Sequence, residues 1–146
     1  MNFALSTINP RAMRYIGSSI LLAALACMIY YTAAAQTLEA TLTEVERAIA
    51  AGDAQALAKY FNADVEINIE DKEQVYNRTQ AAYVTREFFM KYPVKTFRIL
   101  HKGSSGDHFY AVGEYFSQRG KFDTNIFIKK SANGFVIETL RFDKGK

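Results

Sequence analysis

Four runs rich in β-branched and aromatic residues follow Pro93, and they restrict the fold of this chain more than any other feature. The runs are TFRILHK, HFYAVGEYFSQ, FDTNIFIKK and FVIETLRF, and their separators are GSSGD, RGK and SANG. Such short polar separators join neighbouring antiparallel strands. Residues 96–142 are therefore predicted to form a four-stranded antiparallel meander.

The stretch from Leu38 to Ile49 has the spacing of an amphipathic helix. Apolar residues recur every three or four positions, at Leu38, Leu42, Val45 and Ile49. Gly52 can end this helix, and Asp53 can cap a second, short helix. The face that the second helix buries is predicted to comprise Leu57, Tyr60 and Phe61.

A strand and a third helix complete this half. After a predicted turn at residues 62–64, VEINIE alternates strictly and places Val65, Ile67 and Ile69 on one face. A charged connection, DKEQVY, leads to Asn77, a predicted helix N-cap. The third helix aligns Val84, Phe88 and Tyr92 and ends at Pro93. The predicted class is α+β, with three helices packed on a strongly curved antiparallel sheet in the order ααβαββββ.

The first 35 residues have the composition of a signal peptide. They contain Arg11 and Arg14, no acidic residue, and an apolar run at residues 20–31 that is too short for an ordinary membrane span. Ala33–Ala35 fit a cleavage site, so the mature domain is predicted to span residues 36–146 and to be secreted or periplasmic. Two alternatives stay open: a lipoprotein anchor at Cys27, and a true start at Met13.

Charge and cysteine content limit the partners and cofactors. The 18 basic residues include two before residue 36, which leaves 16 against 15 acidic residues in the mature domain. No basic stripe with interleaved aromatic residues is present, which argues against a nucleic-acid partner. The mature domain has no cysteine and two scattered histidines, so neither a disulfide nor a metal site is expected, and no cofactor is predicted.

The phrase AIAAGDAQALAKYFNADVEI resembles the opening of the nuclear transport factor 2-like superfamily, a cystatin-like α+β cone. The passages KYPVKTFRILHKG and FVIETLRFDK are more narrowly similar to the bacterial domain of unknown function 4783. The resemblance implies a conical half-barrel that encloses a pocket, often in a homodimer formed through the sheet. It also implies that the pocket serves either an enzyme or a binding domain, because fold alone does not choose between them.

Candidate catalytic residues are few. An isomerase of this fold needs an inward carboxylate, but alternation turns Glu66, Asn68 and Glu70 away from the pocket. His101 shares a predicted strand face with Phe97 and Ile99 and could line the pocket rim, although a partly exposed strand-end histidine is the simpler interpretation. No catalytic residue is therefore predicted.

The predicted ligand-binding residues come from the third helix and from three strands of the meander. Glu114 and Arg141 lie in mid-strand, where they could orient an anionic ligand as a charge pair or else face solvent or a dimer partner. The outer-face interpretation is preferred for this pair. The complete predicted set is Phe88, Phe97, Ile99, His101, Glu114 and Arg141.

Aromatic residues occupy both alternation classes of the last strands, so both sheet faces should carry apolar rings. The outward set is either Tyr110, Val112, Phe116 and Phe127 or their neighbours Phe109, Ala111 and Tyr115. A homodimer through the sheet face would cover it. The predicted function is non-enzymatic binding of a small apolar molecule or an envelope protein; the alternatives are a cofactor-free isomerase or dehydratase, and a plugged scaffold that acts through dimerisation.

Overall fold

The computed structural model describes residues 37–145, and the predicted signal peptide with Cys27 lies outside the described residues. Helix α2 (Leu38–Ala50) begins at Thr37, whose hydroxyl accepts a hydrogen bond from the Ala40 amide. It ends before Gly52, which has a φ of 65°. Asp53 caps helix α3 (Ala54–Ala58) by accepting from the Ala56 amide at 2.9 Å. The predicted helical corner is confirmed, although Tyr60 and Phe61 lie beyond the second helix.

Strand β1 (Phe61–Ile69) is longer than predicted, because residues 62–64 belong to the strand. The pairing of β1 with the last strand shifts register between Phe61 and Glu66, and this irregularity replaces the predicted turn. The charged connection after β1 was also predicted wrongly, because residues 72–77 form strand β2 (Lys72–Asn77). The two strands form an antiparallel hairpin whose turn residues, Glu70 and Asp71, have φ values of 51° and 65°.

Helix α4 (Arg78–Lys91) starts at the predicted cap, where the Asn77 side chain accepts from the Gln80 amide at 3.0 Å. It ends next to Pro93, as predicted. The predicted meander follows as β3 (Val94–Ser105), β4 (His108–Ser117), β5 (Gly120–Ser131) and β6 (Gly134–Lys144).

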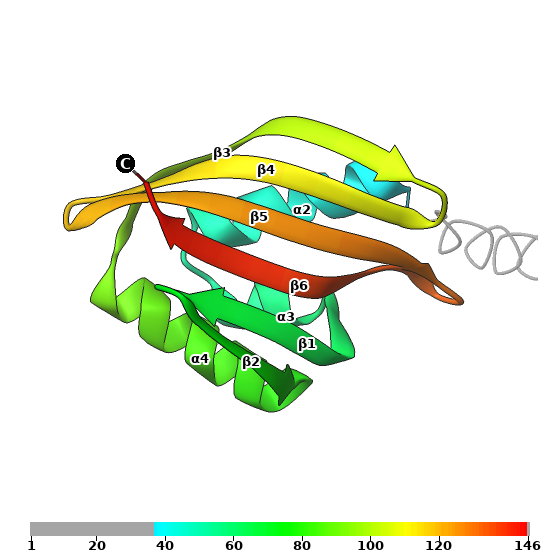
Figure 1. Cartoon of the computed structure of the whole chain (residues 1–146), viewed down its shortest axis with the longest axis horizontal. Coiled ribbons are helices and arrows are strands. Elements are labelled where there is room, and N and C mark those ends of the chain that lie inside the picture. Colours follow the sequence, from blue (N-terminus) through cyan, green and yellow to red (C-terminus); the bar gives the residue numbers. More distant parts are fainter. Residues whose placement is uncertain (1–36, 146) are drawn as a thin grey trace, which may run out of the picture. The chain divides into compact units, whose positions relative to one another are not determined.

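The six strands form one sheet in the order β2-β1-β6-β5-β4-β3. Neighbouring strands are antiparallel, except for β1 and β6, which pair in parallel. The sheet curves over the helices, as the arched strands β3 to β6 show in Figure 1. The predicted α+β class is confirmed, with one strand more than expected.

The core lies between the inner face of the sheet and the helices. Alternation along β4 and β5 directs Ala111, Tyr115, Phe122 and Ile126 inward, where all are fully buried. Tyr110, Phe116 and Phe127 point to the opposite face and are 44%, 38% and 44% exposed. The structure therefore selects the first of the two predicted outward sets. Among residues 37–145, no helix is long and apolar enough to cross a membrane.

Candidate functional site

A groove of about 330 Å³ opens between the β1–β2 hairpin and helix α4. Its floor is apolar, and four charged side chains stand around it. The residues that line it are Ile67, Ile69, Glu70, Lys72, Tyr76, Val84, Glu87, Phe88 and Lys91.

Two sequence periods build the floor of this groove. Ile67 and Ile69 are two residues apart on β1, so both face α4. Val84 and Phe88 are four residues apart on α4 and share its inner face. The groove therefore forms where a strand face and a helix face meet at the open side of the sheet.

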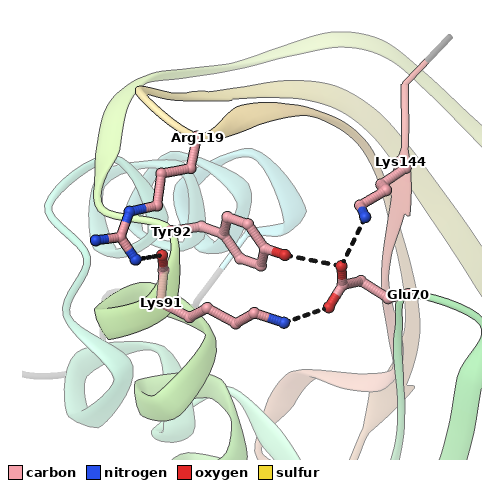
Figure 2. A network of polar contacts seen from close by, with 5 residues as sticks. All are labelled: Glu70, Lys91, Tyr92, Arg119 and Lys144. Atoms are coloured by element: carbon pink, nitrogen blue, oxygen red, sulfur yellow. Dashed lines mark hydrogen bonds and ion pairs between the residues drawn. The ribbon is translucent and has the colours of Figure 1, made fainter.

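Glu70, which lines the groove, is the centre of a network of polar contacts (Figure 2). Its carboxylate accepts a hydrogen bond from Lys91 Nζ at 2.8 Å and another from the Tyr92 hydroxyl at 2.7 Å. Lys144 Nζ lies 3.1 Å from the same carboxylate. The network joins the β1–β2 turn to the end of α4 and the end of β6. Arg119 extends it by donating to the Lys91 carbonyl oxygen at 3.1 Å.

The contacts in this network favour the ionised forms of Glu70 and Lys91. Hydrogen bonds from Lys91, Tyr92 and Lys144 lower the pKa of Glu70 to about 2. The hydrogen bond to Glu70 in turn raises the pKa of Lys91. The Glu70 carboxylate is therefore ionised at neutral pH and is a weak base.

Aromatic rings fill the interior behind the groove. Phe88 stacks on Phe142 with ring centroids 4.2 Å apart, and it meets Phe122 edge to face at 5.1 Å. Tyr92 and Tyr115 pack against the same rings, and the Tyr115 hydroxyl donates to the Tyr92 carbonyl oxygen at 2.5 Å. These rings occupy the space between the sheet and α4, so the groove is at the edge of the core.

The six predicted ligand-binding residues do not come together. Phe88 is the one that lines the groove. Phe97 is buried in the core, and the centroids of the Phe97 and Tyr115 rings are 6.5 Å apart. Ile99 is half-buried on β3, and its amide donates to the Glu46 carboxylate at 3.1 Å.

His101 is on the other face of the sheet from Phe97, so the predicted shared face is wrong. A bulge between Ile99 and His101 shifts the register of β3 against β4. Ile99 lies opposite the buried Gly113, whereas His101 lies opposite Val112 on the outer face. The extra residue reverses the alternation, and His101 is exposed.

Glu114 and Arg141 lie on the outer face and do not pair with each other. Lys121 Nζ is 2.6 Å from the Glu114 carboxylate. Arg141 lies 3.7 Å from Glu73 and 3.8 Å from Asp143. Both residues agree with the preferred outer-face interpretation, and the ligand-orienting charge pair does not form.

The charged rim of the groove was missed in the sequence. Alternation had placed Glu70 outward with Glu66, but its left-handed backbone turns the side chain toward α4. The signals that could have found the groove were the matching apolar faces of residues 67–69 and 84–88. Predicting the rim would have required recognising strand β2, which contributes Lys72 and Tyr76 to the lining. Across residues 37–145, no cluster of three or more histidine, cysteine or acidic side chains could hold a metal ion.

Solved structures with this fold include two family relatives and a more distant neighbour. A DUF4783 family protein from Bacteroides ovatus is 28% identical with a TM-score of 0.68, and the match covers 70% of this chain and 94% of that protein. A second family member, from Bacteroides uniformis, is 28% identical with a TM-score of 0.68, and the match covers 71% of this chain and 96% of that protein. An NTF2-like protein of unknown function from Cytophaga hutchinsonii is 10% identical with a TM-score of 0.58, and the match covers 78% of this chain and 95% of that protein. At this identity the similarity shows only that the two proteins share a fold.

A comparison with curated proteins found no match to this chain. The family model described as "Domain of unknown function (DUF4783)" matches residues 42–143. This match spans the domain from the middle of α2 to the end of β6. The predicted recognition is thereby confirmed, and the chain belongs to the DUF4783 family, with the NTF2-like fold.

Proposed function

We propose that this protein is a binding domain that holds a small, mainly apolar molecule in the groove between the β1–β2 hairpin and α4. The observation that carries the proposal is the composition of the groove, which combines an apolar floor with a charged rim. Ligand pockets commonly have apolar walls and a few polar groups that orient the ligand. A volume of about 330 Å³ is at the lower end of the range for such pockets.

The rim sets the polarity of the ligand. Lys91 is held by Glu70, whereas Lys72 projects from the edge strand β2 and is exposed. An apolar body can lie on Ile67 and Val84 while a polar end of the ligand reaches Lys72. The proposed ligand is therefore an apolar molecule with at most one polar end.

An enzymatic role is supported less well by the same geometry. Glu70 and Glu87 are the carboxylates in the groove lining. A proton shuttle works best with a pKa near the pH of operation, and the pKa of Glu70 is lowered to about 2 by its three donors. Glu87 is exposed, so water competes for any proton that it exchanges.

Fluorescence titration with N-phenyl-1-naphthylamine, a neutral apolar probe, tests the binding proposal. The unmodified protein should bind the probe, and Val84→Glu should weaken binding at least tenfold because it places a charge on the apolar floor. Tyr83→Glu is the matched control, because Tyr83 is the neighbouring residue of α4 and is 61% exposed outside the groove. Equal binding by both variants, or no binding by the unmodified protein, would exclude the groove as an apolar site.

Self-association through the outer sheet face is a second proposed role. Tyr110 and Phe127 are directly opposite each other on β4 and β5, and each is 44% exposed. Exposed aromatic neighbours on one sheet face are typical of an interaction surface. A second copy of the domain is the proposed partner, as expected for this fold from the resemblance.

We also propose that residues 1–35 direct export and are removed before Gln36, so that the domain acts as a secreted or periplasmic protein. The supporting features are the two early arginines, the short apolar run and the alanines before Gln36. Mass spectrometry of protein purified from its native host measures the mature N-terminus. A mass that starts at Gln36 is expected, and a lipid-modified Cys27 would contradict it.

A further inference from the structure

A second hollow lies where three separate parts of the fold meet, away from the groove. Its volume is about 370 Å³, and none of its lining residues belongs to the groove. The connection from α3 to β1, the first residue of α4 and the turn between β5 and β6 form its walls. The lining residues are Lys59, Tyr60, Arg78, Ser131, Asn133, Phe135 and Val136.

The charge of this hollow is entirely positive. Lys59 and Arg78 are its ionisable cations, and its lining contains no carboxylate. A neighbouring hollow of about 390 Å³ is also lined by both cations, again without a carboxylate. Among residues 37–145, no carboxylate oxygen lies within 4.0 Å of a charged nitrogen of Lys59 or Arg78. The groove, by contrast, balances two lysines with two glutamates.

Arg78 is positioned by the fold. Its Nε donates to the Phe61 carbonyl oxygen at 3.1 Å, which ties the guanidinium to the start of β1. This bond uses one donor and leaves the two terminal amino groups for another acceptor. A planar guanidinium held in this way suits the two oxygens of a carboxylate or phosphate.

The remaining walls are aromatic and polar, and they are held by backbone and ring contacts. The Tyr60 carbonyl oxygen accepts from the Ile137 amide at 2.6 Å, which joins the α3–β1 connection to β6. Phe135 packs edge to face on Phe109 with centroids 5.5 Å apart. Asn133 contributes an amide from the β5–β6 turn. A ring and an anionic group can therefore be recognised in one hollow.

We propose that this hollow binds a small organic anion, with a carboxylate or phosphate group on Lys59 and Arg78 and an aromatic ring against Tyr60 and Phe135. The site is independent of the groove and goes beyond the function proposed for it. A protein with both sites binds two chemically different ligands: an apolar molecule and a small aromatic anion.

NMR titration of the ¹⁵N-labelled domain with benzoate and with phenyl phosphate tests the proposal. Benzamide, which has the ring without the charge, is the neutral control. Either anion should shift the amides of Tyr60, Asn133 and Phe135 and the Arg78 Nε–H signal. Benzamide should bind at least tenfold more weakly than the better anion.

Two variants test the cations. Lys59→Gln and Arg78→Gln should each weaken binding of the better anion at least fivefold. Lys95→Gln is the matched control, since it removes the same charge from an exposed lysine of β3 that lines neither the groove nor the two cationic hollows. The Lys59 side chain makes no hydrogen bond or ion pair among residues 37–145, so its variant tests the site even if Arg78→Gln unfolds the domain.

Three results would overturn the proposal. The first is the absence of shifts at these residues with millimolar benzoate and phenyl phosphate. The second is benzamide binding as tight as the anions, which would make the charge irrelevant. The third is equal weakening by Lys59→Gln and Lys95→Gln, which would reduce the effect to net charge.

Discussion

Glu70 connects three elements that are far apart in the sequence. Its carboxylate receives Lys91 and Tyr92 from the end of α4 and Lys144 from the end of β6. Its left-handed backbone is unusual for a residue with a long side chain, and this conformation aims the carboxylate at its partners. The backbone conformation of one residue therefore places a carboxylate in the lining of the groove.

Glu70→Gln should destabilise the domain by about 1 kcal/mol at pH 7, because the charge-assisted hydrogen bonds are lost but the lysines are solvated. The folded-state pKa of about 2 is below the ordinary value of 4.5, so the contribution is complete above pH 4.5 and disappears as the pH falls through 2. Urea unfolding of both proteins between pH 2 and pH 7 measures the difference. Glu39→Gln, which removes an exposed pair with Lys102, is the control. A difference that did not change with pH would contradict the assignment.

Tyr115 is the residue where the two sheet faces are most easily confused. It belongs to the second of the two alternative outward sets, but it is fully buried, and burial raises the pKa of its hydroxyl. Tyr115→Phe should cost about 1 kcal/mol, because the Tyr92 carbonyl oxygen loses its donor. Tyr115→Lys should unfold the domain, since a charge would enter the core. Thermal unfolding measured by circular dichroism distinguishes these outcomes; equal melting temperatures for all three proteins would refute the burial.

At the scale of elements, the close approach of β3 and β4 depends on a glycine. A Cβ atom on Gly113 would lie 2.7 Å from the Arg98 carbonyl oxygen and 2.8 Å from the Phe97 ring. Gly103 also has close neighbours, but they are the outer end of the exposed Tyr110 side chain, 2.3 Å away. The atom that a Cβ on Gly113 would meet belongs to the backbone and cannot move alone, whereas the Tyr110 side chain next to Gly103 can rotate away.

Gly113→Ala should therefore destabilise the domain by about 2 kcal/mol or more, because the strands must separate. Gly103→Ala should cost less than about 1 kcal/mol, because Tyr110 can adopt another rotamer. Chemical denaturation of the two variants provides the comparison. A larger loss at Gly103 than at Gly113 would contradict the pairing of β3 and β4 described above.

At the scale of the whole molecule, the outer sheet face is predicted to mediate a homodimer. Phe116→Lys should shift the mass measured by light scattering at tens of micromolar from dimer to monomer, with an unchanged circular dichroism spectrum. Tyr83→Lys is the control, because Tyr83 is exposed on α4 instead of the sheet. A monomer mass for the unmodified protein would rule out the dimer and leave these rings for a different partner.

Much of the fold could be predicted because it is encoded in local patterns. Helix α2 followed from the spacing of Leu42, Val45 and Ile49, and the starts of α3 and α4 followed from the caps at Asp53 and Asn77. The four strands after Pro93 followed from the four β-rich runs. The site was predicted less well, since Phe88 alone of the six candidate residues lines the groove. A groove is made by residues from several elements, and sequence spacing says little about which of them converge.

The sequence by itself determined the type and order of most elements, because helical and strand periods, caps and short turns act within a few residues. Tertiary structure alone decided three features. Strand β2 is almost wholly exposed and has no apolar alternation, so it exists through its backbone pairing with β1. The bulge before His101 moved that residue to the outer face, and the left-handed turn at Glu70 brought it to α4. Each of these depends on contacts between distant segments, whose free energy does not appear in the local pattern.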